Sequence, residues 1–201
     1  MNEFTIVDLL RHGEPEGGQK FRGAIDDPLS ARGWEQMRAA VGDYGEWETI
    51  ISSPLIRCAA FAQALAQQLN RPLEIVEDFT EIGFGVWEGQ TVTAVHDAEP
   101  QALGRFWRDP IAYPIPGGEP VVDFDRRIAR AWTDLLERYR GRHVLLVAHG
   151  GVIRMILRQV LDMPARRIWR IEAPFASLTR MRLHCDPEAE PHLVFHNGRL
   201  A

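Results

Sequence analysis

Two histidines in this sequence each follow an apolar run and each precede glycine. Arg11 and His12 come directly after an apolar run and lead into Gly13, while His149 follows a second run and leads into Gly150. Glycine lets the backbone turn sharply and lets a ligand approach closely. An imidazole can act as a nucleophile or base, and a guanidinium binds anions. Taken singly, each histidine has an equally good reading as a structural residue.

Arg57 strengthens the case for an anion site. It falls in the first turn of a helix expected to start near Pro54, after the strand-end residues Ser52 and Ser53. The positive end of a helix dipole disfavours a cation there by roughly 0.3–1 kcal/mol, and a bound phosphate would compensate. Ligands of open α/β sheets bind beyond the carboxyl ends of the strands, where these three segments meet. The sequence therefore predicts a phosphate pocket.

A carboxylate near this pocket could handle protons. Glu81 is the natural candidate, since Ile82, Phe84 and Trp87 could partly desolvate it and a bound phosphate would raise its pKa further. Glu88 has a similar setting. Spacing alone does not choose between the two glutamates.

The elements that must position these residues alternate between strands and helices. This order predicts a three-layer α/β/α sandwich around a mainly parallel sheet. The irregular, glycine- and proline-rich stretch 79–118 is interpreted as a small helical cap insertion within one domain, 1–201. The expected strands are 5–10, 49–52, 73–76, 143–148, 169–171, 177–183 and 193–195, and the expected helices follow Ser30 and Pro54 and span about 123–140 and 150–161.

The composition of the chain restricts the classes of partner that it is expected to bind. The chain has 201 residues, 45% of them hydrophobic, and a net charge of -5, which is unsuited to binding a nucleic-acid backbone. No apolar run is long enough to cross a bilayer and the first residues do not resemble a signal peptide, so a cytoplasmic protein is expected. Cys58 and Cys185 are interpreted as ordinary thiols, Cys58 being buried. A homodimer is left open.

Five ordered blocks closely resemble the histidine phosphatase superfamily, also called phosphoglycerate-mutase-like. The blocks cover about residues 5–161 and are Leu10-Arg11-His12-Gly13-Glu14, Asp27-Pro28-Leu29-Ser30 with Gly33, Ser52-Ser53-Pro54 with Arg57, Glu81 through Gly89, and Val147-Ala148-His149-Gly150-Gly151.

The resemblance implies a role for each matching residue. His12 would be the nucleophile, Arg11, Arg57 and His149 would bind the phosphoryl group with Gly150, and Glu81 rather than Glu88 would be the acid and base. The family's usual Thr and Asn after the first block are replaced here by Pro15 and Gly18, so one familiar phosphate contact is missing.

The expected chemistry is hydrolysis of a small-molecule phosphomonoester through a phosphohistidine. Neutral His12 attacks phosphorus while its other ring nitrogen is held by a backbone carbonyl, and Arg11, Arg57 and a protonated His149 hold the phosphoryl oxygens. No metal or other cofactor is expected, because fixed cations supply the charge.

Several alternatives remain beside this hypothesis. A metal hydrolase using Asp8, His12 and His149 is disfavoured by the neighbouring arginines. A non-catalytic phosphate-binding module, a phosphoglycerate mutase and a broad sugar-phosphate phosphatase stay open. The compact length and the segments 21–23 and 26–27 look most like the α-ribazole phosphatases of cobalamin assembly. The expected pocket rim consists of Phe21, Arg22, Gly23, Trp107 and Glu119.

Overall fold

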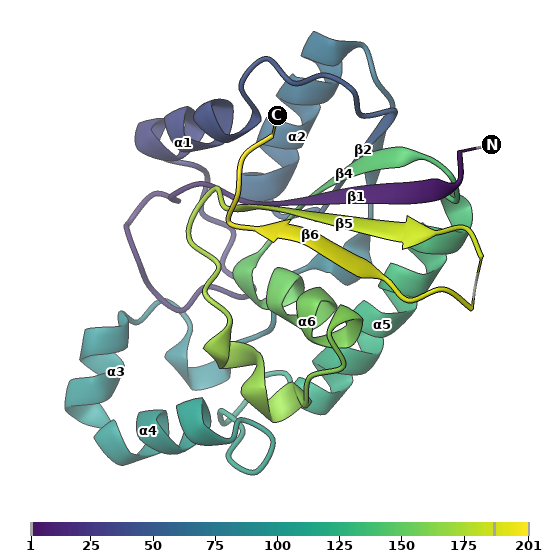
Figure 1. The fold of residues 1–201 in the computed structure, drawn as a ribbon. Coiled ribbons are helices and arrows are strands. Elements are labelled where there is room, and N and C mark those ends of the chain that lie inside the picture. Colours follow the sequence, from purple (N-terminus) through teal and green to yellow (C-terminus); the bar gives the residue numbers. More distant parts are fainter. Residues whose placement is uncertain (1, 187, 201) are drawn as a thin grey trace.

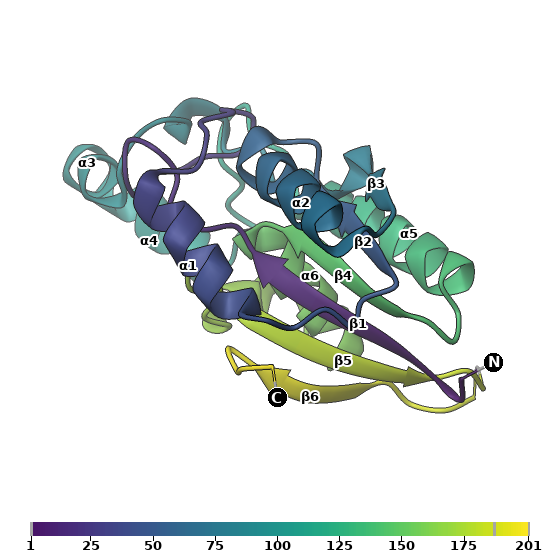
Figure 2. The same cartoon turned by 90° about the horizontal axis from the view of Figure 1, so that it is seen from above.

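The structure is a computed structural model that describes residues 2–186 and 188–200. Within them the strands form one six-stranded sheet with the order β3-β2-β4-β1-β5-β6 (Figures 1 and 2). The first four are mutually parallel, and β5 and β6 extend the sheet in antiparallel fashion. The strands are β1 (Phe4–Arg11), β2 (Thr49–Ser52), β3 (Leu73–Ile75), β4 (His143–Ala148), β5 (Leu178–His184) and β6 (His192–His196).

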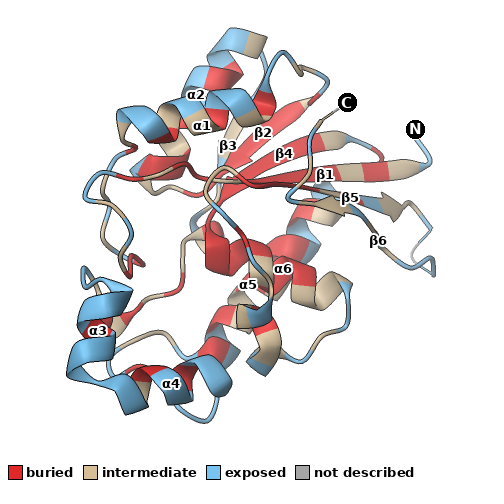
Figure 3. Cartoon of the chain, turned by 60° about the vertical axis from the view of Figure 1, so that its left-hand side comes forward, coloured by how far each residue is buried: buried red, intermediate tan, exposed pale blue. Residues whose placement is uncertain are grey.

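Helices cover both faces of the sheet, as the sequence predicts. Helices α1 (Ala31–Val41) and α2 (Ile56–Leu69) lie on one face of the sheet and α5 (Val121–Arg138) lies on the other (Figure 2). Met37 of α1 and Phe61 of α2 pack with Leu10 of β1, whereas Phe124 of α5 packs with Leu9, because successive side chains of a strand point to opposite faces. The result is a three-layer α/β/α sandwich with a buried core on each side of the sheet (Figure 3). The long helices are α1 (Ala31–Val41), α2 (Ile56–Leu69), α5 (Val121–Arg138) and α6 (Gly150–Val160).

The first turns of α1 and α2 show which of the predicted helix-capping residues cap a helix in the structure. The Ser30 side chain accepts a hydrogen bond from the Gly33 N–H at 3.0 Å, which confirms Ser30 as the cap of α1. Helix α2 begins at Ile56, two residues later than Pro54 suggests. Its first N–H donates instead to the Asp26 carboxylate at 2.7 Å. A distant loop therefore caps α2, which no local pattern could reveal.

The expected strand at 169–171 is wrong. These residues fall at the end of the 3-10 helix η3 (Ala165–Arg170) and just beyond it. In this conformation Ile168 is fully buried, while Arg167 and Arg170 on either side of it face the cavity described below. Side chains three residues apart share one side of a 3-10 helix, so Arg167 and Arg170 can both face the cavity while Ile168 is buried. In a strand, Arg167 and Arg170 would point to opposite faces.

The stretch 79–118 carries short helical pieces that extend past the carboxyl ends of the parallel strands (Figures 1 and 3). They are η1 (Glu77–Phe79), η2 (Gly85–Trp87), α3 (Val92–Ala98) and α4 (Pro100–Arg108). Leu103 and Phe106 bury one side of α4. Among the described residues, no helix is long and apolar enough to cross a membrane.

Candidate active site

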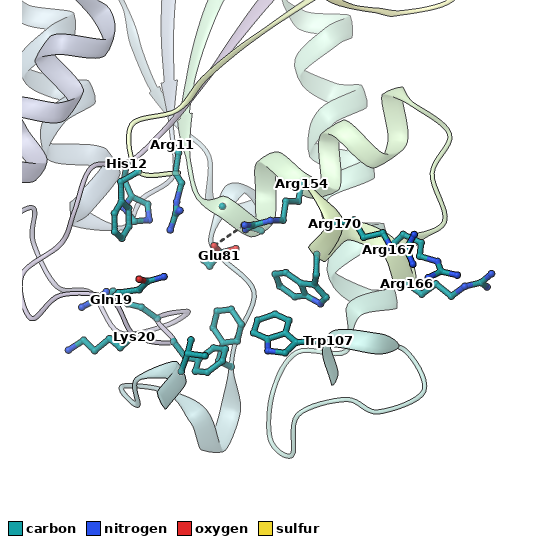
Figure 4. A pocket seen from close by; sticks show the side chains of 18 of the residues that line it. Arg11, His12, Gln19, Lys20, Glu81, Trp107, Arg154, Arg166, Arg167 and Arg170 are labelled. Atoms are coloured by element: carbon teal, nitrogen blue, oxygen red, sulfur yellow. Dashed lines mark hydrogen bonds between the residues drawn. The ribbon is translucent and has the colours of Figure 1, made fainter. Parts of the chain in front are cut away.

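A cavity of about 490 Å³ opens where β1 and β4 end (Figure 4). Its wall combines the end of β1, the loop 19–22, the segment around Glu81, helix α4, the start of α6, η3 and Phe175. The parallel strands bring these segments to one edge of the sheet, as expected for an open α/β fold.

His12 lies at the cavity with its ring orientation fixed. Its Nδ1 is 2.8 Å from the carbonyl oxygen of Gly13, so Nδ1 carries the proton and donates it. This leaves Nε2 with its lone pair. Burial, together with the charges of Arg11 and Arg57, holds the pKa of His12 well below 6.5. His12 is therefore a neutral imidazole at neutral pH, the form that a nucleophile requires.

Arg11 points along the same wall (Figure 4). One terminal nitrogen donates to the carbonyl oxygen of Ala173, and the guanidinium lies 4.3 Å from the centre of the Phe175 ring. Its buried Nε has no partner among the described residues. Burial, followed by the charge of Arg154, lowers the pKa of Arg11 to about 10, so it stays charged. Arg11 thus offers an unused donor to an anion.

Arg57 and His149 lie behind His12 and are not part of the cavity wall. The two histidine rings are 5.2 Å apart, centre to centre, and Arg57 Nε lies 3.3 Å from His149 Nδ1. The terminal nitrogens of Arg57 donate to the carbonyl oxygens of Arg22, Gly23 and Ile25. The structure thus brings both residues to the site. Their direct contact with a phosphoryl group stays a prediction.

His149 was expected to be protonated while it holds a phosphoryl group, and that charge stays a prediction. Burial, then the charges of Arg57 and His12, lowers the pKa of His149 well below 6.5. Arg57 donates to its Nδ1, so the single proton of the neutral ring lies on Nε2, which donates to the Ser53 hydroxyl oxygen at 2.7 Å. Without a bound anion, His149 is therefore neutral.

Glu81 faces the cavity across from His12 (Figure 4). Its Oε2 accepts the Gly151 N–H at 2.9 Å and its Oε1 accepts the Ile82 N–H at 3.0 Å. A Cβ on Gly151 would overlap Glu81 Oε1. Glycine at position 151 therefore allows a carboxylate to sit against the start of α6.

Glu88 has a different setting. Its Oε1 accepts N–H groups from Gly23, Ala24 and Phe84 at 2.9–3.1 Å. It ties the loop around residue 23 to the segment around residue 84, and it does not line the cavity. The choice between Glu81 and Glu88 that spacing left open is thus a matter of position, and only Glu81 can reach a ligand.

Comparison with known proteins agrees with this geometry. The model of the histidine phosphatase superfamily, branch 1, matches residues 7–195. The chain belongs to the histidine phosphatase superfamily.

Curated relatives of this chain include two mycobacterial proteins. Bifunctional protein Rv2228c of Mycobacterium tuberculosis is 32% identical over 98% of this chain, which spans about half (55%) of that relative's length. A glucosyl-3-phosphoglycerate phosphatase of Mycolicibacterium vanbaalenii is 34% identical over 78% of this chain and 74% of its own.

Solved structures share the fold. A mycobacterial glucosyl-3-phosphoglycerate phosphatase superimposes with a TM-score of 0.83 at 26% identity, over 96% of this chain and 99% of its own. The α-ribazole phosphatase of Shigella flexneri reaches 0.80 at 23% identity, over 96% of each chain. The latter likeness concerns the fold alone.

Only part of the expected pocket rim lies at the cavity. Phe21, Arg22 and Trp107 line it. Gly23 does not, and its backbone carbonyl instead accepts from Arg57. The prediction that Glu119 lies at the rim is wrong. Glu119 forms a bidentate ion pair with Arg127, whose Nη2 lies 2.7 Å from Glu119 Oε2, and it does not line the cavity. Neutralised in this way, Glu119 contributes to folding rather than to the rim.

Two blocks of the sequence match shape the catalytic loop. A Cβ on Gly13 would overlap the Gly33 carbonyl, and a Cβ on Gly33 would overlap the Glu14 carbonyl. The Ser30 hydroxyl also donates to the Glu14 carbonyl at 2.9 Å. The second block therefore fixes the backbone that follows His12, without touching the cavity.

Several residues that line the cavity were not predicted from the sequence. Gln19 lies beside Gly18, where the family Asn is missing, and its side-chain amide makes no hydrogen bond to a described residue (Figure 4). Arg154 had a signal of the same kind as Arg57, since it lies near the start of α6. Phe175 had none, because it comes from an irregular loop. The remaining residues missed were Lys20, Val92, Arg108, Arg166, Arg167, Trp169 and Arg170.

The position of Asp8 argues against the metal-hydrolase alternative, in which it would be the carboxylate ligand. Asp8 is fully buried and accepts hydrogen bonds from Trp47 at 2.8 Å and from Arg180 at 2.8 and 2.9 Å, with His143 at 2.9 Å. It is not part of the cavity wall. Within residues 2–186 and 188–200, no group of three or more His, Cys, Asp or Glu side chains could hold a metal ion.

Proposed function

We propose that this chain is a metal-independent phosphomonoester hydrolase that works through a phosphohistidine on His12. The observation that carries the proposal is the state of His12: Nδ1 is held by the Gly13 carbonyl and the pKa is lowered, so Nε2 is available to attack (Figure 4). Arg11 on one side and Glu81 on the other supply the remaining chemistry.

In the first step, the Nε2 lone pair of His12 forms a bond to phosphorus as the bond to the ester oxygen breaks. Glu81 gives its proton to that leaving oxygen, so an alcohol departs. The unpartnered Nε of Arg11 and the N–H of Gly150, at the start of α6, stabilise the phosphoryl oxygens, while the Gly151 N–H holds Glu81. Gln19, which lines the cavity, would replace the missing Asn contact. Arg57 and His149 would contribute from behind His12.

In the second step, Glu81 takes a proton from a water molecule whose oxygen attacks phosphorus. The bond between phosphorus and Nε2 breaks, its electrons return to the imidazole, and inorganic phosphate is released. Glu81 ends protonated and ready for the next ester. A mutase would instead return the phosphoryl group to a second substrate hydroxyl, so the product distinguishes the two activities.

The substrate itself is left to experiment. The aromatic lining of Phe21, Phe84, Trp107 and Trp169 suits a substrate with a flat or bulky alcohol, which keeps α-ribazole 5′-phosphate in consideration. A panel of α-ribazole phosphate, sugar phosphates, nucleotides and phosphoglycerate, compared by kcat/KM, decides among them. A cytoplasmic location, a homodimer and a cap role for 79–118 stay predictions.

The deciding experiment measures phosphate release from a generic phosphomonoester in excess EDTA. We expect activity in the wild type, none in His12→Ala, and full activity in His96→Ala, whose histidine is exposed on α3. The covalent intermediate should be trapped as an acid-labile phosphoryl label absent from His12→Ala. Activity restored only by a divalent metal would overturn metal independence, and binding without turnover would indicate a phosphate-binding module.

A further inference from the structure

The cavity wall carries far more positive charge than one phosphoryl group needs. Eight arginine and lysine side chains line it, and Glu81 is the only carboxylate among its described lining residues. The whole chain, in contrast, has a net charge of -5. Positive side chains are therefore concentrated at the cavity, although the chain as a whole is negatively charged.

Most of these cations lack a counter-charge. Lys20 and Arg22 share Asp27, at 3.0 and 2.8 Å. The other six arginines of the wall have no carboxylate within 4.0 Å in the part of the chain that the structure describes. Elsewhere in the fold, partly buried arginines such as Arg127 and Arg158 are paired with acids.

Arg154 is the best placed of the six. Its Nε donates to the Ile171 carbonyl at 2.7 Å and its guanidinium lies 5.5 Å from the centre of the Trp169 ring, which fixes its direction. Its two terminal nitrogens make no hydrogen bond to a described residue. In Figure 4 it lies next to Glu81, on the side away from His12.

Arg154 and Arg11 approach the same point. A Cβ on Gly150 would lie 2.8 Å from Nη1 of Arg154 and 3.2 Å from Nε of Arg11. Two guanidinium groups this close repel each other; the charge of Glu81 raises the pKa of both, but burial, the largest cause, lowers the pKa of each by more. Arg11 serves the phosphoryl group in the mechanism above, and Arg154 extends the positive surface toward the substrate alcohol.

We propose that Arg154 binds a second anionic group of the substrate, a carboxylate or a second phosphate on the alcohol part. This inference rests on the proposed phosphatase function and names the substrate class. The planar guanidinium fork, with both terminal nitrogens unused, matches two oxygens of either anion. Arg167 and Arg170 of η3 lie farther along the wall and increase the local concentration of such anions.

The test compares two esters that differ only in charge. 3-Phosphoglycerate carries a carboxylate where glycerol 3-phosphate carries a hydroxymethyl group. We expect the wild type to favour 3-phosphoglycerate by about 10-fold or more in kcat/KM, the range of a charged hydrogen bond. Arg154→Gln should abolish this preference, chiefly through KM. Arg154→Lys should keep part of it.

Arg130→Gln is the matched control, because Arg130 is exposed on α5 and lies outside the cavity wall. It should keep the preference. Fructose 1,6-bisphosphate against fructose 6-phosphate tests the second phosphate in the same way. Thermal unfolding of each variant shows that it is folded.

Two results would overturn the inference while leaving hydrolysis intact. The wild type could show no preference for the doubly anionic esters, or Arg154→Gln could slow all esters equally, which would assign Arg154 to the phosphoryl group itself. If no ester is hydrolysed, the proposed function fails separately. Calorimetric binding of 3-phosphoglycerate and glycerol 3-phosphate to His12→Ala then tests the preference without turnover, and equal affinities would overturn the inference.

Discussion

At the scale of residues, the Glu81 carboxylate reaches the backbone of α6 because residue 151 has no side chain. The Gly151 N–H holds one carboxylate oxygen at 2.9 Å, and the Ile82 N–H holds the other. A proton donor must be placed to a few tenths of an ångström, since the contribution of acid–base catalysis depends on reaching the leaving oxygen. Glycine at this position is thus part of the catalytic arrangement.

Gly151→Ala should therefore displace Glu81. We expect kcat for an alkyl phosphate to fall by about 10²-fold, the lower end of what a general acid contributes. The loss should be much smaller with 4-nitrophenyl phosphate, whose leaving group needs little protonation. Steady-state kinetics with both esters measures this.

Gly104→Ala is the control, because a Cβ there meets nothing within 4 Å and the residue lies within helix α4. It should leave both rates unchanged. An equal loss for both esters in Gly151→Ala would contradict the assignment of Glu81 as the acid.

At the scale of elements, the loops that form the cavity wall are held by polar side chains from other segments. Arg22 donates to Asp27 and to the carbonyl oxygens of Glu16 and Gly18, which closes its own loop. Glu88 ties that loop to the segment carrying Phe84. The backbone of Phe21 also exchanges hydrogen bonds with Gly89 and Gln90 at 2.8 Å, so Glu88 adds to these contacts in fixing where Phe21 and Arg22 lie.

Glu88→Gln should destabilise the protein by about 2 kcal/mol, because backbone N–H groups lose a charged acceptor. KM should rise as the loop around residue 23 moves, with a smaller effect on kcat. Denaturant unfolding and steady-state kinetics give the two values.

Glu81→Gln is the comparison, and we expect the opposite pattern: a large loss of kcat with nearly unchanged stability. The assignment of Glu88 to loop positioning fails if Glu88→Gln lowers kcat as strongly as Glu81→Gln does.

At the scale of the whole molecule, a buried polar network crosses the sheet away from the cavity. Asp8 of β1 receives hydrogen bonds from Arg180 of β5 and from Trp47, and it contacts His143 of β4. Burial pushes the pKa of Asp8 upward, but hydrogen bonds from Arg180, His143 and Trp47 outweigh it and hold the pKa below 3.8. The unfolded chain therefore binds this proton more readily than the folded protein does.

Asp8→Asn should lower the free energy of unfolding by about 3 kcal/mol at neutral pH, because the partly buried guanidinium of Arg180 loses its carboxylate. The contribution of Asp8 is complete above 3.8 and is lost as the pH falls through its lower folded pKa. The difference between wild type and variant should therefore shrink at acid pH. Denaturant titrations at pH 7, 5 and 3 measure it, and a difference independent of pH would show that the charge of Asp8 is not responsible.

The sequence alone predicted most of the fold and named the candidate catalytic residues. Periodic apolar residues placed the parallel strands and long helices, since helix and strand periods are properties of a local segment. The strand-end rule then brought Arg11, His12, Arg57 and His149 together. The positions of protons were harder to predict from the sequence. The hydrogen bond from the His12 ring to a backbone carbonyl was expected, whereas the charge of His149 depends on burial among residues far along the chain.

Tertiary structure decided everything that rests on contacts between distant segments. It separated Glu81 from Glu88, removed Glu119 from the rim and turned residues 169–171 from a strand into the end of η3. It also placed Arg154 against Arg11, although 143 positions separate them in the chain. Local patterns report which face of a segment is buried, but the partner that a side chain meets there is set by how the loops fold over the sheet edge.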